Sequence, residues 1–461
     1  MALDYTVRLG YAPTRREIFS REDAQRQRSA ILEKIKGYDV EILDIDWLND
    51  EGLLYDSADA EAVARYFTVN GADAVFAPHC NFGTEDAVAR MAKLVDRPLL
   101  LWGPRDDKPL PDGLRTRDSQ CGLFATSKVL QRLGVPFTYI ENCALDSPVF
   151  AREFDQFLSV CSIVKNFRGM RIGQIGTRPE GFWSVICDEG ELLGRLGIQT
   201  IPISLPEIVQ AMEELLAAGD KRVDGAVDQF RSRYEISCGE KAIRSMAALK
   251  FAISDWAESR KLSAVAIQCW NALQAMTGVM PCVINGELTE EGLPMACETD
   301  IHGAITSVIL SSAVRGRTPI FFSDLTVRHP ENDNAELLWH CGPFPYSLKE
   351  PGAPARIGDH YLLDSHSPGV GEWPIRGGDI TICRFDGIGG SYRLLSEEGV
   401  SVDGPVNRGT YVWVEFPDWP ALERKFIEGP YIHHVACAHG KLSAVLDAAT
   451  TYLQGITPDH C

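Results

Sequence analysis

The stretch DAVFAPHCNFGTEDAVARMAKLVDRPLLLWG (residues 73–103) shows the alternation that decides the fold of this chain. An apolar run at 73–79 is followed by an amphipathic helical stretch at 84–95 and then by a second apolar run at 98–103. Strands that alternate with helices need crossover connections, which are typical of a parallel sheet covered by helices. The stretch therefore predicts a doubly wound α/β domain.

The alternation continues on both sides of this stretch. Apolar runs lie at 6–12, 40–46 and 136–141, and helical stretches lie near 20–36, 58–70, 119–133 and 148–167. A second series of strands and helices begins at 170–176, after Arg168-Gly169 interrupts the pattern. We therefore predict two Rossmann-like, doubly wound domains, the first at 1–168 and the second at 169–318.

The character of the sequence changes after residue 318. Pro, Gly and His become frequent, and short alternating runs such as DITICRF (379–385) and GTYVWVEF (409–416) dominate. This pattern predicts a mostly antiparallel, β-rich C-terminal domain at 319–461. The expected fold class is thus α/β, with two Rossmann-like domains followed by a β-rich domain.

Length and charge exclude several classes of protein. A chain of 461 residues is too long for one hydrophobic core, which supports two or three domains. The formal net charge of −19 disfavours binding to nucleic acid or to an anionic membrane surface. Neither a signal peptide nor a membrane span is apparent in the sequence, so we expect a cytoplasmic protein.

The 13 cysteines form no CxxC pair, which argues against a disulfide framework or a zinc ribbon.

The segment PMACETDIHGAITSVIL (294–310) is the first candidate site. Glu298 and His302 are four residues apart, so on a helix they would share a face and could bind a metal ion. In the alternative interpretation, Glu298 and Asp300 complement the dipole at a helix start, and His302 is a packing residue.

Asp324 and the histidines of the C-terminal region are the other candidates. Asp324 ends the apolar run of FFSDLTV (321–327), and ligands of open α/β sheets bind beyond strand ends, although a turn or a helix cap would also explain it. His340 lies in LLWHCGPFP, and YIHHVACAHGK contains His433, His434 and His439. On a strand, His433 and His434 would face opposite sides, so at most one should reach a given metal. A polar strand end or a subunit contact is the alternative.

Carboxylates and imidazoles without cysteine favour an exchangeable ion such as Mn²⁺. The cysteines near the candidates, Cys297, Cys341 and Cys437, are interpreted as packing neighbours, with a thiolate zinc site as the alternative. The sequence contains no GxGxxG, no GxxxxGK[ST] and no GxSxG motif.

Several segments together resemble the superfamily of L-fucose isomerase and L-arabinose isomerase. The resemblance lies in ACETDIHGAIT, FFSDL and YIHHVACAHG, and also in VRLGYAPTRR, PHCNFGTEDA and LLLWG near the N-terminus. It implies a metal-dependent aldose-ketose isomerase that acts on a monosaccharide through a cis-enediol. It also implies a homo-oligomer, with a hexamer expected, whose active sites lie near subunit boundaries.

The resemblance assigns roles to individual residues. Glu298, Asp324 and His434 match metal ligands, with Mn²⁺ expected or another divalent cation such as Co²⁺ or Mg²⁺, and the two carboxylates would also act as base and acid. His340 resembles an additional histidine of the arabinose branch and is the fourth candidate metal ligand. The substrate contacts expected are Arg16, His79, Asn81, Arg178, Gln268 and Trp270.

Other functions are compatible with the same residues. Arg15, Arg16 and Arg178 leave open an anionic sugar, sulfonated or acidic, because a guanidinium binds such groups in a bidentate manner. A metal-dependent sugar lyase or epimerase would share the enediolate chemistry. A non-catalytic sugar-binding protein of the same fold is the alternative outside enzymes.

Overall fold

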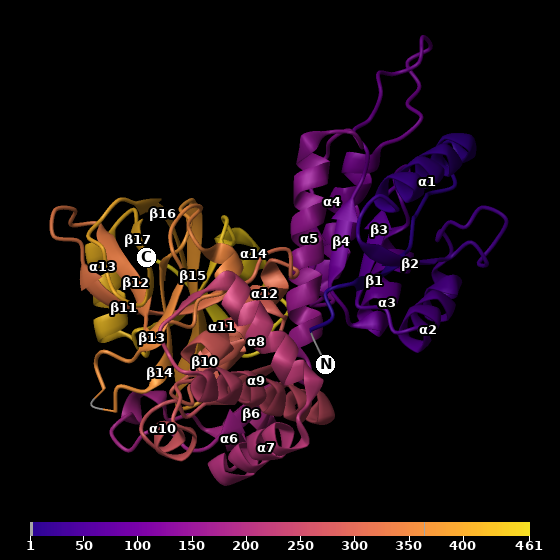
Figure 1. Ribbon diagram of the computed structural model, residues 1–461. Helices are drawn as coiled ribbons and strands as arrows, with labels where there is room; N and C mark the ends of the chain where they lie inside the picture. The colour runs from indigo at the N-terminus through magenta and orange to yellow at the C-terminus, as the bar shows by residue number, and fades with distance from the viewer. Residues whose placement is uncertain (1–2, 364) are drawn as a thin grey trace. The chain divides into compact units, whose positions relative to one another are not determined.

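The computed structural model describes residues 3–363 and 365–461. The chain forms two compact units, coloured along the chain in Figure 1. The N-terminal unit comprises residues 5–165 with 451–453, and the C-terminal unit comprises mainly residues 166–450 and 454–461. The chain is thus a mixed α/β protein with parallel sheets and a β-rich region.

The N-terminal unit is an open parallel sheet with helices on both faces. Its strands are β1 (Val7–Tyr11), β2 (Val40–Asp44), β3 (Ala74–Pro78), β4 (Leu99–Trp102) and β5 (Thr138–Tyr139), in the order β2-β1-β3-β4-β5. Its helices are α1 (Arg21–Ile35), η1 (Ser57–Asp59), α2 (Ala60–Val69), α3 (Glu85–Val95), α4 (Ser119–Arg132) and α5 (Pro148–Phe167). Helices α1 and α5 pack in one hydrophobic cluster, and α2, α3 and α4 pack in another. This arrangement matches the doubly wound pattern expected from residues 73–103.

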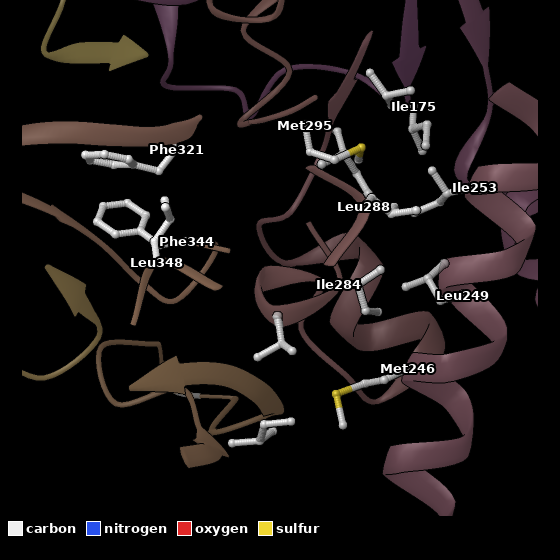
Figure 2. Packing of buried hydrophobic residues seen from close by; sticks show 14 of the residues in the cluster. Ile175, Met246, Leu249, Ile253, Ile284, Leu288, Met295, Phe321, Phe344 and Leu348 are labelled. Atoms are coloured by element: carbon white, nitrogen blue, oxygen red, sulfur yellow. The ribbon is translucent and has the colours of Figure 1, made fainter. Parts of the chain in front are cut away.

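The C-terminal unit begins with a second parallel sheet, in the order β10-β9-β6-β7. Its strands are β6 (Arg171–Ile175), β7 (Gln199–Ile203), β9 (Ala264–Ile267) and β10 (Met295–Cys297). The helices around it are η2 (Trp183–Val185), α6 (Glu189–Leu196), α7 (Leu205–Ala218), α8 (Lys221–Arg233), α9 (Glu240–Arg260), α10 (Ala272–Thr277), α11 (Cys282–Glu290) and α12 (Ile301–Ala313). Figure 2 shows side chains of α9 and α11 packing beside Ile175 and Met295 of the sheet.

The β-rich region of the same unit contains a closed ring of antiparallel strands. The region comprises β11 (Phe321–Arg328), β12 (Ala335–His340), η3 (Tyr346–Leu348), β13 (Arg356–Asp359), β14 (Pro368–Pro374), β15 (Asp379–Ile388), β16 (Ser391–Val402), β17 (Thr410–Glu415), α13 (Trp419–Glu428), β18 (His434–His439), α14 (Ser443–Thr450) and β19 (Ile456–Asp459). Neighbours run β16-β15-β18-β11-β12-β17, and pairing of β16 with β17 closes the ring into a barrel. Closure removes the exposed edges that an open sheet would present.

The predicted boundary at residue 318 does not separate two compact units. Strand β8 (Glu235–Ile236), which precedes that boundary, pairs with β13. Residues of the parallel sheet and of the barrel, such as Val265 and Val435, belong to one hydrophobic cluster. The region of the second parallel sheet and the β-rich region therefore share a core.

Helix α12 joins these two parts because it is buried along its whole length. Its sequence, IHGAITSVILSSA, is apolar or small on every side, as expected for a helix without a solvent-facing surface. It contacts β9 of the parallel sheet and β15 and β18 of the barrel. Neither α12 nor any other helix in the described residues is long and apolar enough to cross a membrane.

A buried carboxyl group in the barrel makes the stability of the fold depend on pH. Glu336 on β12 is only 4% exposed. Burial and the neighbouring Glu423 raise the pKa of Glu336 from 4.5 to about 8, although Arg328 partly offsets them. At a pH between 4.5 and about 8, the Glu336 carboxyl group is ionised in the unfolded chain but protonated in the folded chain. The free energy of unfolding therefore falls as the pH rises through this range.

We expect Glu336→Gln to stabilise the protein at pH 8 by about 2 kcal/mol, since one pKa unit corresponds to roughly 1.4 kcal/mol and solvent screens part of the shift. At pH 4.5 the substitution should have little effect. Urea unfolding at both pH values measures the difference. Glu415→Gln on the adjacent β17 is the control, and an equal gain at both pH values for Glu336→Gln would contradict the assignment.

Candidate active site

Three segments of the C-terminal unit bring the predicted metal ligands together. Glu298 lies between β10 and α12, and Asp324 and His434 are cross-strand partners on β11 and β18. His434 Nε2 lies 3.1 Å from Glu298 Oε2 and 3.8 Å from Asp324 Oδ1. The structure therefore places in one site three residues that are up to 136 positions apart in the sequence.

Glu298 reaches this site from a strained turn and not from a helix. Glu298 and Thr299 have φ values of 63° and 57°, and α12 begins only at Ile301. The expectation that Glu298 and His302 share a helix face is therefore wrong. The turn is held by Thr299, whose N–H donates to the Ile267 carbonyl at 3.1 Å and whose hydroxyl donates to the Thr177 carbonyl at 3.2 Å. Consecutive left-handed residues other than glycine are costly, and such strain is concentrated at functional sites.

Asp324 is also placed differently from its predicted position at the end of a strand. Strand β11 continues to Arg328, and both of its neighbours, β12 and β18, are antiparallel to it. The rule for the carboxyl ends of open parallel sheets therefore does not explain the position of Asp324. It faces the site because it lies opposite His434, and residues opposite each other in an antiparallel pair interact directly.

Asp300 orients the imidazole of His434. Its Oδ2 accepts a hydrogen bond from His434 Nδ1 at 2.9 Å, and its Oδ1 accepts the Gly303 N–H at 2.9 Å as the cap of α12. Nε2 of His434 is thereby directed toward Glu298 and Asp324. A carboxylate that accepts from the far nitrogen of a histidine is the usual support of a metal-binding imidazole.

The charges of the site stabilise one another. Burial lowers the pKa of His434, but Asp300 and Glu298 outweigh it and raise the pKa to about 9. Burial raises the pKa of Glu298, but the adjacent His434 outweighs burial and holds it below its ordinary value. The pKa of Asp300 also lies well below its usual range, because Arg384 and His434 outweigh the effect of burial. Glu298 and Asp300 are therefore carboxylates at neutral pH.

Buried polar atoms without partners converge on this site. Asp324 Oδ1, His434 Nε2 and His340 Nε2 have no hydrogen bond among the described residues. Such atoms are costly to bury unless a ligand or an ion satisfies them. Asp324, His433 and His434 can each offer one ligand atom with all three atoms within 4.8 Å of one another. The donor set of carboxylate oxygens and imidazole nitrogens thus fits a divalent cation.

His433 is nearer to this set than strand alternation predicts. Strand β18 begins at His434, so His433 lies before the pleated region. The ring centroids of His433 and His434 are 4.4 Å apart, and His433 is exposed whereas His434 is buried. The expectation that only one of the two could approach a given ion is therefore not met.

His340 lies beside Asp324, but its hydrogen bonds favour a role other than ligand. Its Nδ1 accepts the Cys341 N–H at 2.8 Å, and its Nε2 lies 4.0 Å from Asp324 Oδ1. Because Nδ1 accepts a hydrogen bond from the Cys341 N–H, the ring proton of neutral His340 lies on Nε2. A protonated Nε2 has no lone pair to offer to an ion, and direct ligation of a metal by His340 stays a prediction.

Arg178 and Gln268 line a cavity that adjoins the turn with Glu298, and Trp270 follows on the same loop as Gln268. A cavity of about 620 Å³ is lined by Thr177, Arg178, Pro179, Glu180, Trp183 and Gln268. The side-chain oxygen of Gln268 accepts the Thr177 N–H at 3.0 Å, and the Thr177 carbonyl accepts the Thr299 hydroxyl. Trp270 packs edge-on against Phe182, with ring centroids 5.3 Å apart. Their contact with substrate stays a prediction, but the cavity adjoins the Glu298 turn.

Arg16, His79 and Asn81 lie together in the N-terminal unit, on the loops after β1 and β3. Asn81 Oδ1 accepts the Arg16 N–H at 2.8 Å and the Gly83 N–H at 3.2 Å. His79 is buried against Thr126, with 2.8 Å between Nε2 and Oγ1, and burial lowers its pKa to about 4. Only Arg16 keeps a partly exposed charged group, which stacks 4.2 Å above the Phe82 ring. Contact of these residues with substrate across a subunit boundary stays a prediction.

Sequence reasoning missed the charged residues behind His434. Arg384 is 1% exposed and lies between Asp300 and Asp386, and Asp386 in turn pairs with His302 at 2.8 Å. The available signal was an arginine and an aspartate within the apolar strand DITICRFDG. Buried charges of this kind are almost always paired.

Comparison with known proteins supports the sequence resemblance. Residues 10–168 match the family described as Fucose/sulfoquinovose isomerase, N-terminal domain. Proteins named sulfoquinovose isomerase from Priestia aryabhattai and Priestia megaterium are each 26% identical over 85% of this chain and 85% of their own length. A protein of the same name from Alkalicoccus urumqiensis is 27% identical over 76% of this chain and 78% of its own length.

Gly303 tests the close packing at the start of α12. A Cβ added there would lie 2.6 Å from both Asp300 Oδ2 and the Phe322 ring. We expect Gly303→Ala to destabilise the protein by about 1–3 kcal/mol, as overpacking of a core does. Gly225→Ala in α8 is the matched control, because a Cβ there meets no atom within 4 Å. Thermal unfolding compares the two variants. If Gly303→Ala stabilised the protein as much as Gly225→Ala, the tight packing around Asp300 would be contradicted.

Proposed function

Because this chain belongs to the fucose isomerase-like superfamily of sugar isomerases, we propose that it converts an aldose into a ketose through a cis-enediol. The proposed substrate is an anionic sugar, and a sulfonated aldose is the form that the relatives' names favour. The observation that carries the proposal is the convergence of Glu298, Asp324 and His434, with unpartnered buried atoms on Asp324 and His434.

The proposed chemistry moves a proton between two adjacent carbons. A base removes the weakly acidic proton at C2 and an acid returns a proton at C1, while the hydroxyl proton of O2 is transferred to O1 and the carbonyl moves from C1 to C2. Glu298 and Asp324 lie 3.1 and 3.8 Å from His434 Nε2 and supply the two carboxyl groups that this exchange needs. Glu298 is ionised, because its net pKa lies below the ordinary value, and it can therefore accept a proton.

The proposed cofactor is Mn²⁺, with Co²⁺ or Mg²⁺ as alternatives, held by Glu298, Asp324 and His434. Two carboxylates and one imidazole suit these moderately hard cations. Such an ion supplies positive charge that stabilises the oxygens of the substrate as they become negative. Asp300 keeps the imidazole of His434 in place, and the burial of His434 and Glu298 limits access of bulk water.

Arg178 is the proposed anchor for the anionic end of the sugar. Within the described part of the chain, its guanidinium donates to the Pro179 and Glu180 carbonyls, at 3.3 and 3.1 Å, and forms no ion pair with a carboxylate. Its charge therefore remains available in the cavity beside Gln268. A guanidinium can bind two oxygens of a sulfonate or carboxylate at once.

Substitution of the two carboxylates tests the enzyme proposal. We expect Glu298→Gln and Asp324→Asn each to lower turnover of a sulfonated aldose at least about 100-fold and to weaken Mn²⁺ binding, since each removes both a charge and a proton acceptor. NMR of the products in D₂O, with elemental analysis of bound metal, provides the readout. Asp333→Asn, an exposed turn residue, is the control.

The same NMR measurement separates the alternatives. Ketose product with deuterium at C1 or C2 supports isomerisation. Cleavage products, or an epimerised aldose without ketose, would show instead that the chain is a lyase or an epimerase. Sugar binding without Mn²⁺ binding or turnover would identify a sugar-binding protein.

A comparison of charged and neutral sugars tests Arg178. We expect Arg178→Met to raise KM for a sulfonated aldose about 10- to 100-fold, because a charge-assisted hydrogen-bonded pair is lost. KM for the neutral aldose of the same stereochemistry should change less than about twofold. Arg195→Met, which removes another guanidinium of the same unit, is the control. Equal effects on both sugars would exclude Arg178 as the anion anchor.

A further inference from the structure

Arg384 forms a buried bridge behind the proposed metal site. Its Nη1 and Nη2 contact Asp300 at 2.5 and 3.2 Å, and its Nε and Nη2 contact Asp386 Oδ2 at 2.9 and 2.8 Å. Arg384 and Asp300 are each only 1% exposed, and Asp386 is 5% exposed. One guanidinium thus compensates two buried carboxylates and holds them at a defined separation.

The hydrogen bonds of Asp300 leave little freedom for its side chain. Oδ1 accepts from Gly303 N–H at 2.9 Å and from Arg384 Nη2 at 3.2 Å, while Oδ2 accepts from Arg384 Nη1 and from His434 Nδ1. Each partner of Asp300 in this set is a donor, so Asp300 acts only as an acceptor. Nδ1 of His434 must then carry a proton, and the neutral ring presents its lone pair at Nε2.

We propose that Arg384 is a positioning residue for the metal site: its guanidinium fixes Asp300 in the rotamer that orients His434 and selects its Nδ1–H tautomer. This inference rests on the proposed function and deepens it, because His434 is a ligand only in that proposal. Arg384 acts through Asp300, because its guanidinium pairs with Asp300 and Asp386.

Asp386 and His302 hold Arg384 in turn. Asp386 Oδ1 accepts from His302 Nδ1 at 2.8 Å, while its Oδ2 accepts from Arg384. His302 packs edge-on against the Phe385 and Tyr392 rings, with centroids 5.4 and 6.0 Å away. The orientation of His434 is thus connected to α12 and β15 by charged groups that cannot rotate freely.

A lysine at position 384 would keep the charge but lose this geometry. Its single ammonium group cannot donate from fixed, coplanar nitrogens to both oxygens of Asp300 and also to Asp386. Arg384→Lys therefore separates charge compensation from positioning. It is preferable to Arg384→Met, which would leave two buried carboxylates uncompensated and could prevent folding.

The test measures Mn²⁺ affinity of the full chain by calorimetry. We expect Arg384→Lys to weaken Mn²⁺ binding about 10- to 100-fold, as loss of the outer support of a ligand does. Arg117→Lys is the matched control, because Arg117 is 2% exposed and likewise bridges two aspartates, Asp23 and Asp107, in the N-terminal unit. That substitution should leave Mn²⁺ affinity within about twofold of the wild-type value.

The tautomer of His434 gives a readout that needs no metal. In the metal-free chain with ¹⁵N-labelled histidine, His434 should show a protonated Nδ1 above the pH at which its ring becomes neutral. In Asp300→Asn, Nδ1 of His434 loses its carboxylate acceptor, so we expect the fraction of the Nδ1–H tautomer to fall and that of the Nε2–H tautomer to rise. We expect Arg384→Lys to give a mixture of both tautomers.

A double variant tests whether Arg384 acts through Asp300. If it does, Asp300→Asn with Arg384→Lys should weaken Mn²⁺ binding no more than about the larger single effect, because coupled residues are not additive. Fully additive losses, or an Arg384→Lys protein that folds and binds Mn²⁺ like the wild type, would overturn the inference. Failure of the wild-type chain to bind Mn²⁺ would instead refute the proposed function, and the tautomer measurement would still test the positioning by Arg384.

Discussion

The hydrogen bond between Asp300 and His434 is the contact on which the rest of the site depends. It joins the start of α12 to the start of β18, and so connects the parallel sheet to the barrel at one point. The turn with Glu298 lies directly before Asp300, and Asp324 lies opposite His434. A shift of the Asp300 side chain would therefore affect all three proposed ligands together.

This contact is possible because α12 is buried on all sides. A helix that contacts both β9 and the strands β15 and β18 cannot slide without disturbing two packed surfaces. Its first turn consequently presents Asp300 at a constant place. The strained backbone at Glu298 and Thr299 is compatible with this rigidity, because the surrounding packing holds a conformation that a free chain would avoid.

The electrostatics of the site follow from the same geometry. The carboxyl groups of Glu298, Asp300, Asp324 and Asp386 lie near one another, and each buried carboxylate requires a compensating charge. Arg384 compensates the inner pair, Asp300 and Asp386. The outer pair, Glu298 and Asp324, has only imidazoles as partners among the described residues. A divalent cation at the outer pair would complete the balance of charge.

The sequence by itself determined the doubly wound N-terminal fold, the β-rich character after residue 318 and the candidate ligands, because hydrophobic periodicity and residue type are local properties. It also indicated the superfamily, since several short segments resemble it in the same order. The turn at Glu298, the cross-strand pairing of Asp324 with His434 and the bridge from Arg384 to Asp300 were decided only by tertiary structure. These features depend on strand register and on contacts between residues 84 to 134 positions apart, and no local pattern encodes such contacts.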